Sequence, residues 1–257
     1  MSHRELQQAL VIAQHDPAFL DDPRDVTLTA AERAELQAVD RRAFATDPLR
    51  RRRVLKALVE ELKASATLFC RERGQIAALE GFFASRWFRR AVIERTPLAP
   101  ALGEFLGEGG SPALAAIARL ETALCRARRP AARELPPAHV GLAPGVAVLH
   151  FDFDVLAAVQ SLERWLFAAT LVPQQVLCDD LPPFPSLTSG GARHLIVTPP
   201  GTLVDADPDL FRVLVSFRDP VPLAAVADRL APLGVPSSRS ASLVESLASD
   251  ELLAVTK

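Results

Sequence analysis

Apolar residues recur at helical spacing over the first two thirds of the chain. One set occupies the i, i+4, i+7, i+11 and i+14 positions of a helix face: Leu55, Val59, Leu62, Ala66 and Phe69. Asp47-Pro48 precedes this set as a cap residue and a first-turn proline. The pattern predicts one long helix with a single buried stripe. Two shorter sets predict further helices: Ile76, Leu79 and Phe83, and then Leu114, Ile117, Leu120 and Leu124.

Helix starts are marked by local capping sequences. Thr29-Ala-Ala-Glu32 has the capping-box pattern, in which the hydroxyl and the carboxylate each accept from a free backbone amide. Ser111-Pro112 marks the start of the helix built on Leu114. These signals predict an antiparallel helical domain at residues 1–170.

Polar and apolar residues alternate from Leu149 to Asp154, which predicts a short half-buried strand. His150, Asp152 and Asp154 would then share one face, where an imidazole and two carboxylates suit a hard metal ion. The alternative is a solvated strand face, with Asp154 as the cap of the following helix. The sequence favours this second interpretation.

Residues 171–192 differ in composition from the rest of the chain. They contain Pro173, Pro182, Pro183, Pro185, Gly190 and Gly191. This pattern predicts an irregular connection between two domains. Asp179 and Asp180, beside Cys178, are candidate metal ligands here, but a carboxylate pair in such a connection is more often solvated.

The pattern of residues 193–257 predicts a small α/β module. Two β-rich runs, 193–198 and 202–205, are separated by Pro199-Pro200-Gly201, which predicts a hairpin. Asp207-Pro208 then predicts the start of a first helix, and two further helices and a closing strand follow. We therefore expect a mainly α fold, in which a helical N-terminal domain precedes a winged-helix-like C-terminal module.

Composition narrows the class of protein. Of 257 residues, 49% are hydrophobic and 23% are charged, as in globular proteins. No stretch reaches the ~18 uninterrupted apolar residues of a membrane-spanning helix, and the first residues lack a signal-peptide pattern. Three widely spaced cysteines, Cys70, Cys125 and Cys178, argue against a disulfide framework and a cysteine zinc site. We expect a cytoplasmic protein with no membrane partner.

Charge is concentrated in one block. Residues 41–99 carry 14 basic and 6 acidic side chains, although the whole chain has a net charge of −2. The block is either a solvated helix face or a docking surface for an acidic protein. Successive helix residues point in different directions, and the predicted partner interface therefore consists of Arg50, Arg53 and Lys56. Nucleic acid is not an expected partner, because basic and aromatic residues do not interleave.

No recognised catalytic motif occurs in the sequence. It contains no GxSxG elbow, no Walker loop, no GxGxxG and no histidine pair at metal-ligand spacing. Tyrosine is absent and five histidines are present, so groups for general acid or base chemistry are few. We expect no catalytic residues and no cofactor or metal on this chain, which favours a binding role.

Four segments together carry a family resemblance. They are LRRRRVLKALVEEL at 49–62, Glu80-Gly-Phe-Phe83, SPALAAIARLETAL at 111–124, and the strand ending at Phe153 with its following helix. In this succession, residues 47–257 resemble a family often described as DNA-binding proteins, whose members include the partner proteins of methanobactin and thiaglutamate biosynthesis.

The resemblance implies a partner subunit in natural-product biosynthesis. Members of that family pair with a TIM-barrel enzyme that holds a multinuclear iron centre and oxidatively modifies cysteine in a ribosomally synthesised precursor peptide. It implies that this chain forms a heterodimer with such an enzyme, that the iron lies on the enzyme, and that the C-terminal module holds the leader part of the peptide. A winged-helix DNA-binding regulator is the alternative function. An iron enzyme in its own right is a third.

An extended peptide could be held by the predicted hairpin. Two paired strands leave an outer row of amides and carbonyls that can accept a third strand, and a face of the hairpin could form an apolar slot for peptide side chains. The alternative is that these apolar residues are all core. The predicted peptide-binding residues are Arg193, His194, Leu195, Ile196, Val197, Leu203, Val204 and Phe211.

Overall fold

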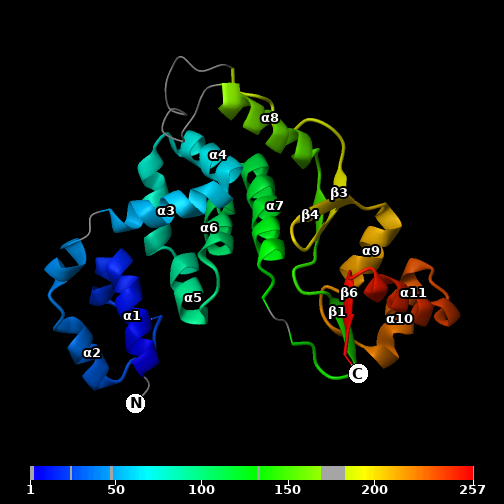
Figure 1. The fold of residues 1–257 in the computed structure, drawn as a ribbon, viewed down its shortest axis with the longest axis horizontal. Coiled ribbons are helices and arrows are strands. Elements are labelled where there is room, and N and C mark those ends of the chain that lie inside the picture. The colour runs from blue at the N-terminus through cyan, green and yellow to red at the C-terminus, as the bar shows by residue number, and fades with distance from the viewer. Residues whose placement is uncertain (1–2, 24, 47–48, 132–133, 169–182, 257) are drawn as a thin grey trace. The chain divides into compact units, whose positions relative to one another are not determined.

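A computed structural model of the chain describes residues 3–23, 25–46, 49–131, 134–168 and 183–256. These residues are mostly helical, with two small three-stranded antiparallel sheets among them (Figure 1). The prediction of a mainly α protein is therefore confirmed. The cap predicted at Asp47-Pro48 and the acidic pair Asp179-Asp180 lie outside the described residues.

The chain divides into two compact units. The first comprises Met1–Thr122 and Ala158–Leu187, and the second comprises Ala123–Ala157 and Thr188–Lys257. The sequence prediction instead placed a boundary at residues 171–192. The difference arises because the strands between residues 139 and 151 pair with strands that follow residue 192. The second unit is thus larger than the predicted C-terminal module.

The first unit is helical. Its elements are α1 (His3–His15), η1 (Pro17–Asp21), α2 (Ala30–Gln37), η2 (Arg41–Thr46), α3 (Arg50–Glu61), α4 (Lys63–Arg73), η3 (Ile76–Ala84), α5 (Arg86–Glu94) and α6 (Leu98–Gly107), with most of α7 (Pro112–Arg128) and α8 (Val155–Ala168). The predicted capping box at the start of α2 is present, since Thr29 and Glu32 each accept from the other's backbone amide.

The long helix predicted from Leu55 to Phe69 is wrong, because the chain breaks at Leu62. That residue has φ −127° and ψ 44°, and it separates α3 from α4. The side chain of Glu121 in α7 accepts hydrogen bonds from the amides of Ala64 (3.0 Å) and Ser65 (2.9 Å) at the start of α4. A carboxylate 56 residues away from Ser65 therefore satisfies helix-start amides that a continuous helix would have bonded internally.

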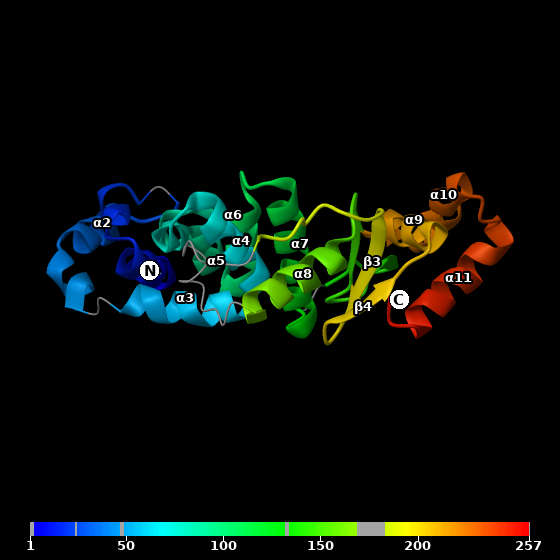
Figure 2. The same cartoon turned by 90° about the horizontal axis from the view of Figure 1, so that it is seen from above.

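The N-terminal helices pack against α5, and α1 lies beside it in both views (Figures 1 and 2). Arg89 of α5 pairs with Asp16 (3.3 Å) and Asp25 (2.9 Å). The side-chain amide of Gln8 donates to the carbonyl of Ile93 at 2.7 Å. These contacts attach a small apolar core of the N-terminal segment to the helical unit.

The second unit holds both sheets. After the end of α7 it contains β1 (His139–Leu142), β2 (Ala147–Phe151), β3 (Arg193–Thr198), β4 (Thr202–Asp205), α9 (Pro208–Ser216), β5 (Val221–Pro222), η5 (Leu223–Ala225), α10 (Val226–Leu230), η6 (Ala231–Leu233), α11 (Ser237–Ser249) and β6 (Leu253–Val255). The strand orders are β5-β1-β6 and β2-β3-β4. The predicted hairpin of β3 and β4 and the predicted helix start at Asp207-Pro208 are both confirmed.

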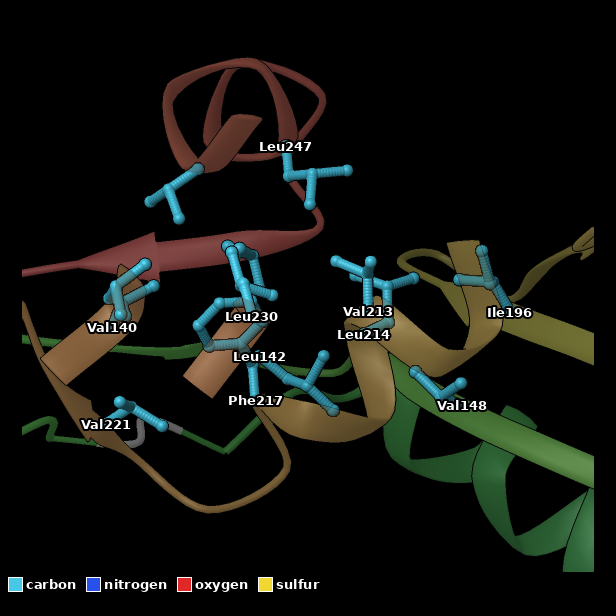
Figure 3. Packing of buried hydrophobic residues seen from close by; sticks show 13 residues of the cluster. Val140, Leu142, Val148, Ile196, Val213, Leu214, Phe217, Val221, Leu230 and Leu247 are labelled. Atoms are coloured by element: carbon cyan, nitrogen blue, oxygen red, sulfur yellow. The ribbon is translucent and has the colours of Figure 1, made fainter. Parts of the chain in front are cut away.

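One apolar core joins the two sheets to helices α9, α10 and α11 (Figure 3). Val140 and Leu142 come from β1, Val148 and Ile196 come from the other sheet, and Phe217 follows α9. Each of these side chains is buried. The core therefore fixes the β2-β3-β4 sheet relative to α9 within this unit.

Candidate functional site

The outer edge of β4 is the part of the predicted hairpin that stays open among the described residues. β3 is the central strand of its sheet, because β2 pairs with one side and β4 with the other. No described strand pairs with the second side of β4. Any added strand must therefore approach β4 rather than β3.

Backbone alternation shows which residues of β4 face outward. The amide of Ala206 donates to the carbonyl of His194 at 2.9 Å, and Val204 lies opposite Ile196. In an antiparallel ladder, every second residue bonds to the neighbouring strand. The amides and carbonyls of the intervening residues, Leu203 and Asp205, consequently point away from β3.

The other edge of this sheet is covered at one position. The guanidinium of Arg218, which follows α9, donates to the carbonyl of Val148 in β2. That carbonyl faces away from β3 by the same alternation. A side chain that caps a strand edge opposes pairing with another chain. The two edges of the sheet thus differ in their capacity to accept a strand.

The predicted apolar residues separate into core and surface. Leu195, Ile196 and Val197 of β3 are buried, so their side chains cannot line a slot for a peptide. The interpretation of these three as core residues is the one that the structure bears out. On β4, Leu203 is half-buried and Val204 is 46% exposed.

A group of three rings lies on the Val204 face of the sheet. His150 of β2 and His194 of β3 are opposite each other, with ring centroids 4.8 Å apart and nearly stacked. Phe211 of α9 is half-buried, and its ring lies 4.3 Å from that of His194. A carboxylate oxygen of Asp152 accepts a hydrogen bond from Nε2 of His150 at 3.1 Å. The ring group therefore presents a partly exposed aromatic surface.

The set His150, Asp152 and Asp154 does not converge as the metal hypothesis required. Asp154 instead accepts from Arg193 (2.6 Å) and from the amide of Ala157 in α8 (3.0 Å). These two hydrogen bonds, that from Arg193 first, lower the pKa of Asp154. The helix-cap interpretation is correct. Over the described ranges, no group of three or more histidine, cysteine or acidic side chains could hold a metal ion.

Arg193 forms ion pairs with two carboxylates, those of Asp154 and Asp205. Its guanidinium donates to Asp154 and also to Asp205 of β4 at 2.9 Å. The hydrogen bonds to Asp154 and then to Asp205 raise the pKa of Arg193, so the guanidinium stays charged. One cation is thus shared by two carboxylates beside the open edge.

The predicted partner-interface residues lie on α3 in the first unit. Arg53 and Lys56 are exposed, whereas Arg50 is only half-exposed. The neighbouring Arg41 and Arg42 are engaged, the first with Asp21 and the second with Asp40. Arg41 and Arg42 beside this helix are therefore already paired with carboxylates.

Sequence reasoning missed the pairing of His150 with His194 and the cover that Arg218 places on β2. The alternation at Leu149–Asp154 predicted a strand but gave no partner for it, since register depends on distant residues.

In the described part of the chain, no helix is both long and apolar enough to span a bilayer. No protein-family model matches the sequence, and it has no significant match among curated proteins.

Proposed function

We propose that this chain is a non-catalytic partner subunit that binds a ribosomally synthesised precursor peptide. In this proposal it presents a cysteine of the peptide to a TIM-barrel multinuclear-iron enzyme in the cytoplasm. The observation that carries the proposal is the open edge of β4. Its outward amides and carbonyls can bond an extended leader segment, in the mode by which many peptides add to a sheet.

Two further features support a binding role. The sequence carries none of the recognised catalytic motifs, and in this proposal the chemistry belongs to the partner enzyme and its iron. In this proposal the hairpin β3–β4 and the helices α9 to α11 act as a winged-helix-like module that holds peptide rather than DNA. The helix that would contact DNA in a regulator, α11, carries a single Arg239 with Glu245, which offers little phosphate neutralisation.

The basic face of α3 is the proposed site for the enzyme. Arg53 and Lys56 are exposed on this helix. Exposed charges of this kind accelerate encounter with an acidic surface more than they tighten the final complex. Reversal of both charges to Glu should therefore slow association at low salt. Unchanged association rates would remove α3 from the interface.

Proline substitution on β4 can test peptide binding at the open edge without disrupting the fold. In Leu203→Pro the lost amide is one that points outward, so β4 should stay paired with β3 while an added strand loses a donor. Val255→Pro is the matched control, because its amide also points outward from an edge strand, β6, in the other sheet. Circular dichroism checks that both variants fold.

Co-purification tests the function itself. The tagged full-length chain should bring down an iron protein and a cysteine-containing peptide, identified by metal analysis and mass spectrometry, and Leu203→Pro should lose the peptide while keeping the iron protein. Salt-sensitive retention of DNA would favour the regulator instead. Stoichiometric iron on this chain alone would identify it as the enzyme.

A further inference from the structure

Val204 and Ala206 form an apolar strip on the face of the sheet that carries the ring group. Val204 is exposed beside the open edge, and Ala206 follows it on the same face. Ala206 is paired through its amide with His194, whose ring contacts Phe211. A long apolar side chain that entered from the edge of β4 would therefore meet small apolar groups first and the aromatic ring of Phe211 beyond them.

The opposite face of β4 is acidic. Leu203 and Asp205 lie on that face, where Arg193 also projects. Because Arg193 is shared between Asp154 and Asp205, this group of three side chains has a formal net charge of −1. The Asp205 side chain remains 61% exposed. A cation placed across from Asp205 would neutralise the group.

We infer that the peptide strand that pairs with β4 carries a large apolar side chain opposite Val204 and a basic side chain opposite Asp205. The inference rests on the proposed function, since it concerns the side chains of the same bound strand. Consecutive residues of a strand point to opposite faces, so the two recognised residues are neighbours in the peptide. Directly opposed side chains on adjacent strands are close enough to select one another.

Display of a random seven-residue peptide library on phage tests the inference. Selection on the full-length chain should enrich peptides in which Leu, Ile, Phe or Trp stands next to Lys or Arg. Val204→Asp should remove the apolar preference and leave the basic one. Asp205→Lys should replace the basic preference by an acidic one. Val255→Asp, at a valine that is 41% exposed on edge strand β6, should leave both preferences intact.

Affinity measurements add a second readout that does not depend on charge reversal. The best enriched peptide, synthesised with a fluorophore, should bind Asp205→Asn about two- to five-fold more weakly than the unsubstituted chain by anisotropy. Phe211→Ala should cause a similar loss for peptides with a large apolar residue and none for the same peptide with Ala there. Circular dichroism confirms that each variant is folded.

The outcomes distinguish the inference from the proposed function. The inference is overturned if the enriched peptides lack the apolar–basic pair, or if selection on the Val204→Asp variant enriches the same pair. Peptide binding at β4 would still stand in either case, provided that Leu203→Pro abolishes binding. Failure to enrich any peptide, or equal binding to Leu203→Pro, overturns both.

Discussion

Helices α6 and α7 approach so closely at Gly103 that an added methyl group has no room. A Cβ placed on Gly103 would lie 1.9 Å from Oγ1 of Thr122 and 3.2 Å from its Cβ. Both residues are buried, and Oγ1 of Thr122 has no hydrogen-bond partner among the described residues. The contact is steric, so the hydroxyl of Thr122 is the group that excludes alanine.

Gly103→Ala should therefore destabilise the helical unit despite a gain in helix propensity. Overpacking of a close contact lowers the free energy of unfolding by about 1–3 kcal/mol, whereas replacing a helical glycine by alanine raises it by about 1 kcal/mol. In a Thr122→Ala background the 1.9 Å contact disappears and the 3.2 Å contact with the Cβ of residue 122 remains, so the same substitution should cost much less. The expected coupling in the double-mutant cycle is about 1–3 kcal/mol.

Urea unfolding followed by tryptophan fluorescence measures this cycle. Trp87 and Trp165 both lie in the first unit, so their emission reports on the unit that contains the contact. Thr122→Ala alone should cost little, because it also removes a buried hydroxyl without a partner. An equal loss of stability from Gly103→Ala in both backgrounds would refute the steric argument.

Three further predictions concern stability. Burial lowers the pKa of His15 from its ordinary 6.5, against the opposing effect of a hydrogen bond with the carbonyl of Val11, and the charges of Arg50 and Arg51 lower it further. The neutral ring is favoured in the fold, so the free energy of unfolding should fall as pH drops below about 6.5. His15→Phe should remove that dependence in urea titrations at pH 7.5 and 5. Glu121→Ala leaves helix-start amides of α4 without an acceptor and should cost about 1–3 kcal/mol, whereas the exposed Glu60→Ala should have an effect within about 0.5 kcal/mol. Glu251 has φ 57° after α11, so Glu251→Gly should raise the thermal midpoint through a gain of up to about 1 kcal/mol; a lower midpoint would contradict this reasoning.

Local sequence determined the features that are completed within a few residues. The capping box at Thr29, the helix starts at Ser111-Pro112 and Asp207-Pro208, and the hairpin around Pro199-Pro200-Gly201 all occur where the sequence predicted them. Each one satisfies backbone groups through side chains or turn geometry near in the chain. No distant partner is needed, which is why the pattern alone identifies them.

Tertiary structure decided the features that depend on distant partners. At the break after Leu62, Glu121 of α7 accepts from the first amides of α4. The apolar stripe that continues across the break gives no indication of that carboxylate. β2 joins β3 rather than the helical domain, and Arg218 covers the edge of β2. The open edge of the β2-β3-β4 sheet therefore lies on β4. Which amides of a sheet stay unpaired depends on the pairing of all its strands.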